Sequence, residues 1–227
     1  MSDGNETFIG ILAADYPVCI YDHRDMENSS DTNTVSPIGQ YADDAAGLMQ
    51  ALGHTSMNVY SVSMGSSISQ QLVLDHPERV DKLIRDLSSC DVRLPENWKL
   101  LDVIQSAAGD SSLPQGLRNE ALANLVWNGS CDNLSTINKD VMLVVGTSDE
   151  LARIRFLSKW PEKSKAHDLS GSRGCRMLVH IMHRSSTGIR LLHSWEPMNP
   201  RHKTGIFSLF FVAFAGTGSL MTRTVSV

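Results

Sequence analysis

The segment Ser61–Gly65, with the sequence Ser-Val-Ser-Met-Gly, lies between an apolar stretch typical of a strand (57–60) and a run typical of a helix (67–74). A chain that passes from strand to helix this quickly must make a tight turn, where only small side chains fit. A serine at the centre of such a turn points its hydroxyl out of the sheet, towards the N–H groups that begin the helix. The pattern usually reads Gly-x-Ser-x-Gly, and Ser61 replaces the first glycine. A match this short also arises by chance, so the surrounding sequence decides whether Ser63 is a nucleophile.

The surrounding sequence alternates between strand and helix. β-branched and apolar residues predict a buried strand before the turn, and a helical spacing of apolar residues ends at Gly53. This order of elements implies right-handed crossovers and a parallel sheet with flanking helices, which is the α/β class. The expected strands are 17–21, 58–60, 82–87 and 140–146, and the expected helices are 38–52, 67–75 and 151–160.

Two regions depart from this alternation. Residues 90–137 lose the strand pattern and contain turn formers followed by a helical stretch at 117–127, which predicts a short helical cap inserted over the sheet at about 91–136. After Gly171 the periodicity disappears until the apolar run 206–215. We therefore expect a core at 8–172, which includes the insertion, and a divergent tail at 173–227.

The apolar run 206–215 is short for a membrane span, which needs about 20 residues. On length alone, the expected structure is a buried strand rather than a membrane contact. Basic residues flank the run at Arg201, Lys203 and Arg223, so a membrane-tethered protein is kept as an alternative.

Composition narrows the class of protein. A chain of 227 residues with 41% hydrophobic content can bury one sizeable core, and its net charge of −5 comes without a basic patch that would bind nucleic acid. No glycine-rich phosphate loop is present, and no cofactor or metal is expected. The cysteines show no CxxC or metal-finger spacing, so we expect free thiols in a reducing compartment. The first residues lack the layout of a signal peptide, which predicts a cytoplasmic location.

A serine nucleophile needs a base and an acid that orients the base. Asp149 follows a buried strand and follows Ser63 in sequence, as the order of such triads in parallel-sheet hydrolases requires. A turn or a helix cap explains an aspartate in Gly-Thr-Ser-Asp equally well. The base candidates are His180 and His183, which lie 31 and 34 residues beyond Asp149. Each of the two, taken singly, is more typical of a packed or solvated histidine.

Two acidic groups have simpler explanations than catalysis. The pair Asp43-Asp44 lies on an expected helix with polar neighbours, which indicates a solvated face rather than a metal site. The run Asp22-His23-Arg24-Asp25 ends a buried strand, where capping and ion pairs are the expected roles.

Several motifs occur in a familiar order. They are Tyr21-Asp22-His23-Arg24, Tyr41-Ala42-Asp43-Asp44, Val59 to Gly65, His76 to Leu83, Cys131 to Ser135, and Val144 to Asp149. Together, over residues 8–172, they resemble the α/β-hydrolase superfamily. The resemblance implies an esterase- or peptidase-like fold that works without a cofactor on a small-molecule acyl substrate. It also implies Ser63 as the nucleophile, Asp149 as the triad acid and the Met64 N–H as an oxyanion donor.

The sequence departs from the family pattern in three places. The early strands with a His-Gly loop, which supply a second oxyanion donor, are expected before Phe8, and the insertion is short. The segment 171–176 stands where a glycine-rich loop with the catalytic histidine is expected. Two functions follow: a serine hydrolase that cleaves an ester or related acyl bond with His180, or else His183, as base, or an impaired fragment of the fold that acts as a binding scaffold.

Overall fold

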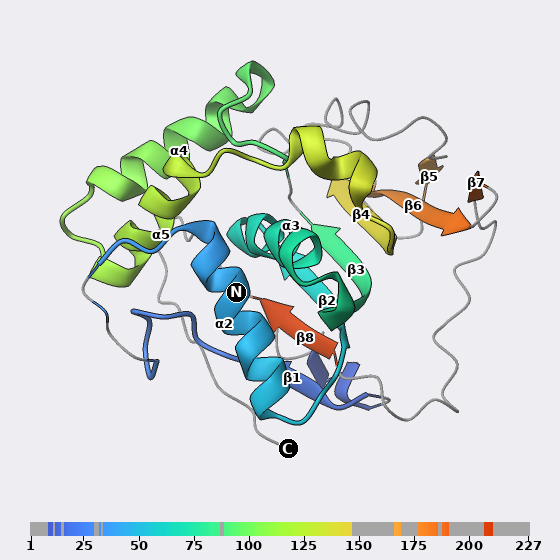
Figure 1. The fold of residues 1–227 in the computed structure, drawn as a ribbon. Helices are drawn as coiled ribbons and strands as arrows, with labels where there is room; N and C mark the ends of the chain where they lie inside the picture. Colours follow the sequence, from blue (N-terminus) through green and yellow to red (C-terminus); the bar gives the residue numbers. More distant parts are fainter. Residues whose placement is uncertain are drawn as a thin grey trace.

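A computed structural model describes residues 9–10, 12–14, 16–29, 32, 34–86 and 89–146, together with the backbone of four later strands (Figure 1). Within this part of the chain, eight strands form one sheet in the order β1-β8-β2-β3-β4-β6-β5, with β7 paired to β6. Their bounds are β1 Val18–Ile20, β2 Met57–Val62, β3 Val80–Asp86, β4 Asp140–Gly146, β5 Ala166–Asp168, β6 Met177–Ser185, β7 Gly188–Arg190 and β8 Phe207–Phe210.

The sheet is parallel over β1, β8, β2, β3 and β4, and antiparallel where β6 pairs with β4, β5 and β7. This confirms the α/β class with a parallel sheet and the four strands expected from β1 to β4. Because parallel strands end at the same edge, the residues that follow β1, β2, β3 and β4 leave the sheet on one side. That edge is where a site built from several strands must form.

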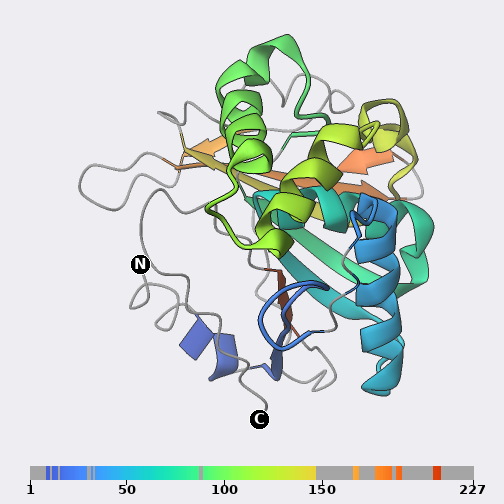
Figure 2. The ribbon, with the colours of Figure 1, turned by 90° about the vertical axis from the view of Figure 1, so that its left-hand side faces the viewer.

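Helices α2 (Ile38–Ala51) and α3 (Met64–Asp75) cover one face of this sheet (Figures 1 and 2). Their apolar residues recur at helical spacing and meet the inward-facing residues of the strands, so a single main core forms between helices and sheet. Helix α2 ends one residue before Leu52, as its apolar spacing predicts, and Gly53 follows with φ +79°. Its fully buried members include Tyr41, Ala45, Ile68, Leu72, Met57, Val59, Leu83 and Val141.

The insertion between β3 and β4 contains two helices and two short 3-10 turns. Its elements are η2 (Pro95–Asn97), α4 (Trp98–Gly109), α5 (Gln115–Val126) and η3 (Cys131–Thr136). The sequence analysis predicts α5 but not α4. Within α4 only Ile104 is buried, and the helix packs on α5 rather than on the sheet.

The later part of the chain contributes to the same sheet. Strand β8 lies between β1 and β2, with Phe210 opposite Ser61, so the expected strand within 206–215 is confirmed over Phe207–Phe210. The division of the chain at residue 172 stays a prediction, and the expected helix 151–160 lies outside the described residues. No helix among those that the structure describes is long and apolar enough to span a bilayer.

Candidate active site

Ser63 occupies the single residue between the end of β2 and the start of α3. Its backbone has φ 54° and ψ −121°, a region that residues with a side chain rarely adopt. Such a conformation costs on the order of 1–3 kcal/mol and persists only where the surrounding structure enforces it. The tight strand-to-helix turn that the sequence predicts is therefore present, and it is strained at the serine.

Ser61 shows how a serine replaces the glycine that usually begins this turn. Its side chain is fully buried between strand and helix, yet its hydroxyl has two partners. Ser61 Oγ shares a hydrogen bond of 2.8 Å with Ser69 Oγ on α3 and donates to the Ile84 carbonyl on β3 at 3.2 Å. The extra atom thus fits because it is small and hydrogen-bonded, as buried polar groups must be.

Ser63 is more exposed than the first turns of the helix that follows it. Ser63 is half-buried, whereas Ser61 and every residue from Met64 to Gln70 are buried. Its side chain does not cap α3, so the hydroxyl is not used to hold the helix end. The first N–H groups of a helix have no partner within the helix, and Met64 supplies the first of them here. The geometry thus places a reachable hydroxyl beside the positive end of a twelve-residue helix.

The loop after β1 leaves the sheet at the same edge as Ser63, and ion pairs fix it in place. Arg24 forms a bidentate pair with Asp44 on α2, with both nitrogen–oxygen distances at 2.6 Å, and this hydrogen-bonded carboxylate raises the pKa of the guanidinium. His23 Nδ1 lies 2.9 Å from Glu120 Oε1 on α5, and both side chains are buried. The ion-pair role expected for this run is therefore confirmed.

The ring of His23 also lies edge-on between two tyrosine rings. Its centroid is 5.3 Å from that of Tyr21 and 5.5 Å from that of Tyr41. Burial, together with the charge of Glu120, raises the pKa of Tyr41 above its usual range. The contact between His23 and Glu120 could not be predicted from the sequence, because the two residues lie 97 positions apart and only the fold brings them together.

Of the remaining triad candidates, one lies outside the described residues and two lie on β6. Asp149 lies outside the described residues, although β4 ends at Gly146 on the same edge as Ser63. His180 is within β6, opposite Leu143. Leu143 pairs with Arg85, and Arg85 pairs with Ser61, so three inter-strand steps of about 4.8 Å, roughly 14 Å in all, separate His180 from Ser61. His183 lies three residues further along β6, opposite Arg190 of β7.

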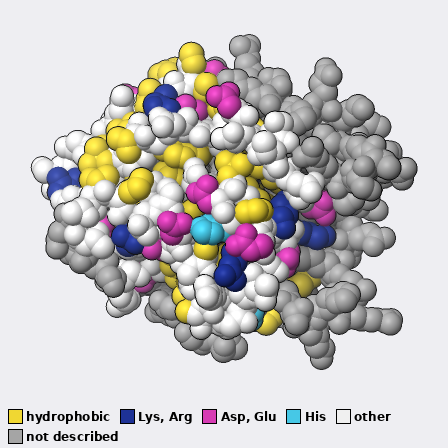
Figure 3. Space-filling model, viewed as in Figure 1, with side chains coloured by type: hydrophobic (Ala, Val, Ile, Leu, Met, Phe, Trp, Pro, Cys, Tyr) yellow, Lys and Arg dark blue, Asp and Glu magenta, His cyan; other side chains and the backbone are white. Residues whose placement is uncertain are grey.

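Each carboxylate of the acidic pair on α2 has a partner. Asp44 binds Arg24, and Asp43 Oδ1 lies 2.7 Å from His76 Nε2. No group of three or more metal-binding side chains occurs among the described residues. On the face shown in Figure 3, acidic and basic side chains are interspersed over the coloured part of the surface, without a continuous basic patch there.

The expectation of four free thiols is wrong for two of the cysteines. Cys90 and Cys131 form a disulfide with their Cα atoms 5.0 Å apart, while Cys19 is free and half-buried. Sequence spacing failed here because 41 positions separate the bonded cysteines, and only the fold brings them together. The two residues do lie at the ends of the predicted insertion, and that position was the available signal.

A family model described as the alpha/beta hydrolase fold matches residues 4–119. Among curated relatives, RutD of Caulobacter sp. (strain K31), whose name assigns it as a carbamate hydrolase, is 36% identical over 77 residues. RutD of Caulobacter vibrioides (strain NA1000 / CB15N) is 36% identical over 76 residues. Each match spans 32% of this chain and only 28% of the relative's length.

Solved structures show the same fold at low sequence identity. An alpha/beta hydrolase enzyme from a Medee basin deep-sea metagenome library, MGS-M2, is similar with a TM-score of 0.52 at 12% identity, over 61% of this chain and 64% of the other. A thermophilic esterase from Thermogutta terrifontis is similar with a TM-score of 0.51 at 19% identity, over 62% of this chain and 66% of the other. The family model, the strand order and the turn at Ser63 agree, and this chain belongs to the alpha/beta hydrolase fold family.

Proposed function

We propose that the chain is a serine hydrolase that cleaves an ester or related acyl bond, with Ser63 as the nucleophile. The observation that carries this proposal is the backbone of Ser63, which holds a half-buried hydroxyl in a strained turn between β2 and α3. Strain of this kind is maintained where it serves to present a side chain. The names of the relatives, a carbamate hydrolase and an esterase, agree with acyl chemistry.

The proposed first step is attack of the Ser63 hydroxyl on the acyl carbon. As the carbonyl oxygen gains negative charge, the N–H of Met64 at the start of α3 donates to it, and the helix terminus favours that charge. The alcohol or amine then leaves with the proton that a base took from Ser63. Water hydrolyses the acyl-enzyme in a second, equivalent step. The acyl substrate is a small molecule.

The base and the acid rest on the sequence alone. We propose Asp149 as the acid, from its place after β4. His180 is the first candidate base and His183 the second. A base must lie within about 3 Å of the serine hydroxyl, or reach it through one water. The pairing of β6 places His180 much further away, so this assignment needs β6 to be positioned differently in the active protein.

Labelling with a fluorophosphonate, which reacts covalently with activated serines, tests the nucleophile. We expect wild-type protein to be labelled on the peptide that contains Ser63, and Ser63→Ala to lose the label. Ser111→Ala changes an exposed serine in the α4–α5 connection and should keep it. Folded wild-type protein that takes no label would contradict the proposal and favour the alternative of a binding scaffold without catalysis.

The same assay tests the two partners. Asp149→Asn and His180→Ala should each slow labelling and ester hydrolysis about a thousandfold or more if they form a triad with Ser63. His183→Ala is the matched control for His180→Ala, because both residues lie on β6. Loss of activity in His183→Ala with full activity in His180→Ala would identify His183 as the base. Full activity in both variants would show that neither histidine of β6 is the base.

A further inference from the structure

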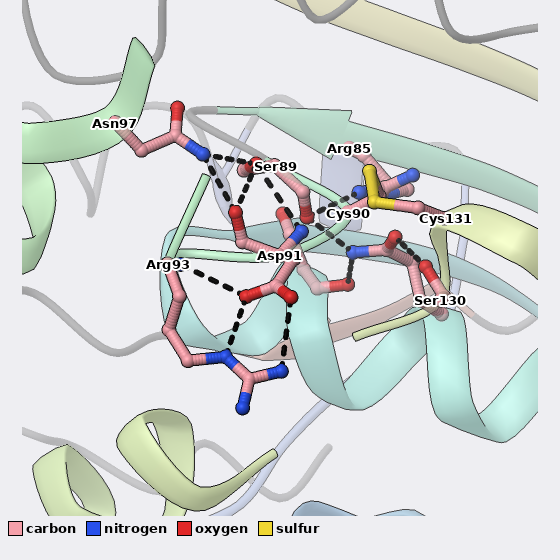
Figure 4. The surroundings of a disulfide bond; sticks show 10 residues. Arg85, Ser89, Cys90, Asp91, Arg93, Asn97, Ser130 and Cys131 are labelled. Atoms are coloured by element: carbon pink, nitrogen blue, oxygen red, sulfur yellow. Dashed lines mark hydrogen bonds and ion pairs between the residues drawn. A yellow bond between two sulfur atoms is a disulfide. The ribbon is translucent and has the colours of Figure 1, made fainter. Parts of the chain in front are cut away.

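The disulfide joins the two ends of the helical insertion (Figure 4). Cys90 follows β3, and Cys131 begins η3, from which the chain continues into β4. Everything between them, including both α4 and α5, forms a loop whose base the bond closes. A backbone hydrogen bond of 2.8 Å, from the Ser130 N–H to the Cys90 carbonyl, lies directly beside it. The two ends of the insertion are thus held together at one point.

Gln70 on α3 contacts both ends at this point. Its side-chain nitrogen donates to the Ser89 carbonyl at 2.9 Å, and its side-chain oxygen accepts from the Ser130 hydroxyl. Gln70 is fully buried and also donates to the Ser66 carbonyl within α3. The helix that begins at the proposed nucleophile is therefore hydrogen-bonded to the base of the insertion.

Further hydrogen bonds hold the end of the insertion that follows β3, around Cys90. The Asn97 side-chain nitrogen donates to Ser89 Oγ and to the Asp91 carbonyl, each at 2.6 Å (Figure 4). Asn97 is the residue before α4, so these bonds fix where that helix starts. They depend on Ser89 and Asp91 keeping their positions on either side of Cys90.

Above its base, the insertion is attached to the rest of the protein through one helix. Helix α5 is hydrogen-bonded to the core through Glu120 with His23 at 2.9 Å, Asn124 with Ser67 at 3.1 Å, and Asn119 with Asp25 at 3.2 Å and with the Thr34 carbonyl at 3.5 Å. Trp127, which follows the helix, donates to Gln71 at 2.9 Å, and together with Ala123 it reaches the main core. Helix α4 packs on α5, and Val92, Ile104 and Ala121 form a small cluster separate from the main core. Elements with few buried apolar contacts open locally at lower free energy than the core.

We propose that the Cys90–Cys131 bond is a reversible thiol–disulfide site that clamps the insertion onto the sheet. Reduction then releases α4 and α5 while the sheet with α2 and α3 stays folded. The bond closes a loop of 41 positions, and cutting it returns to the insertion the chain freedom that the closure removes. The position of the bond, at the base of an insertion with its own small core, makes the effect local.

A dithiol is the class of reductant that fits. Its thiolate attacks the sulfur of Cys131, which is half-buried, rather than that of fully buried Cys90. The S–S bond breaks, Cys90 leaves as a thiolate and takes up a proton, and a mixed disulfide forms at Cys131. The second thiol of the reductant then displaces Cys131, so that two electrons pass to the protein and the reductant becomes a disulfide.

Hydrogen-exchange mass spectrometry on the full chain, before and after treatment with dithiothreitol, tests this site. We expect peptides from 91–130 to exchange on the order of a hundredfold faster after reduction, and peptides from α2, α3 and β2 to keep their rates. Oxidised glutathione should restore the slow exchange. Equal acceleration across the whole protein, no change in any peptide, or a non-reduced mass that shows free Cys90 and Cys131 would each overturn the proposal.

Variants separate this bond from other effects of the reductant. Cys90→Ala/Cys131→Ala should show the exchange of the reduced protein with or without dithiothreitol, and a response that persists in this double variant would also overturn the proposal. Cys19→Ser removes the cysteine that is free among the described residues and should leave the response unchanged. None of these measurements involves Ser63, so they are independent of the proposed hydrolase activity.

Discussion

Ser61 on β2 and Ser69 on α3 share a hydrogen bond, with their hydroxyl oxygens 2.8 Å apart in the interior of the protein. The bond joins the strand that ends at Ser63 to the helix that begins after it. It takes the place of the close backbone contact that a glycine at position 61 would allow. The turn is thus held by a polar contact between the two elements that define it, and its stability should depend on the size and the hydrogen bonding of residue 61.

Substitutions of Ser61 test this dependence through urea unfolding. Ser61→Ala removes the hydroxyl and should lower the free energy of unfolding by about 1 kcal/mol. Ser61→Val also adds volume at a fully buried site, so it should lower that free energy by up to about 3 kcal/mol. The exposed control Ser111→Ala should stay within about 0.5 kcal/mol of wild type. A Ser61→Val protein as stable as Ser61→Ala would show that the space around residue 61 accommodates a larger side chain.

The strain at Ser63 predicts a difference between two variants that both lack the hydroxyl. Ser63→Ala keeps a Cβ atom at φ 54°, whereas Ser63→Gly removes it. Relief of the strain is worth about 1–3 kcal/mol, and glycine loses about 0.5–1 kcal/mol through the freedom of the unfolded chain. Ser63→Gly should therefore be more stable than Ser63→Ala by about 1 kcal/mol in urea unfolding. Equal stability of the two proteins would mean that the turn relaxes at this residue.

The sequence predicts the central architecture because local patterns determine it. Apolar runs mark β2, β3 and β4, apolar spacing with Gly53 marks α2, and a short serine-containing turn marks Ser63. The contacts that hold the insertion depend instead on residues far apart in the chain, such as His23 with Glu120 and Cys90 with Cys131. Sequence periodicity carries no information about such pairs. The prediction of free thiols at Cys90 and Cys131 is therefore wrong. For the same reason, His180 is predicted as the base only because it follows Ser63 and Asp149 in the chain. The strand pairing that separates His180 from Ser61 is not visible in the sequence.

The buried phenol of Tyr41 predicts a loss of stability in alkali. Its side chain is 1% exposed, and burial together with the charge of Glu120 raises the pKa of the phenol above that of a tyrosine in the unfolded chain, about 10. The folded state therefore keeps its proton at a pH where the unfolded state loses it. This contribution to stability is complete below pH 10 and decreases above it, by up to about 1.4 kcal/mol per pH unit.

Tyr41→Phe checks this prediction. No hydrogen-bond partner of the Tyr41 hydroxyl occurs among the described residues, so removing this buried group should raise the free energy of unfolding at pH 7, by about 1 kcal/mol. Urea unfolding between pH 9 and 11 should show a smaller decrease in stability for the variant than for wild type. Parallel curves for the two proteins would mean that Tyr41 ionises in the folded state as readily as in the unfolded chain.

Gly129 lies next to the disulfide at the base of the insertion, and an alanine there should clash with its neighbours. Gly53 serves as the control, because it has nearly the same φ without such neighbours. Gly129 and Gly53 have nearly the same φ, +78° and +79°, but a Cβ at Gly129 would lie 2.6 Å from the Cys90 carbonyl oxygen, whereas one at Gly53 would meet nothing within 4 Å. Gly53→Ala should therefore lower the free energy of unfolding by about 1 kcal/mol through backbone strain alone. Gly129→Ala should lower it by about 1–3 kcal/mol more, because the chain must also move away from Cys90. Urea unfolding measures both losses. Equal losses in the two variants would show that the Cys90 carbonyl moves away from the new Cβ atom without a loss of stability.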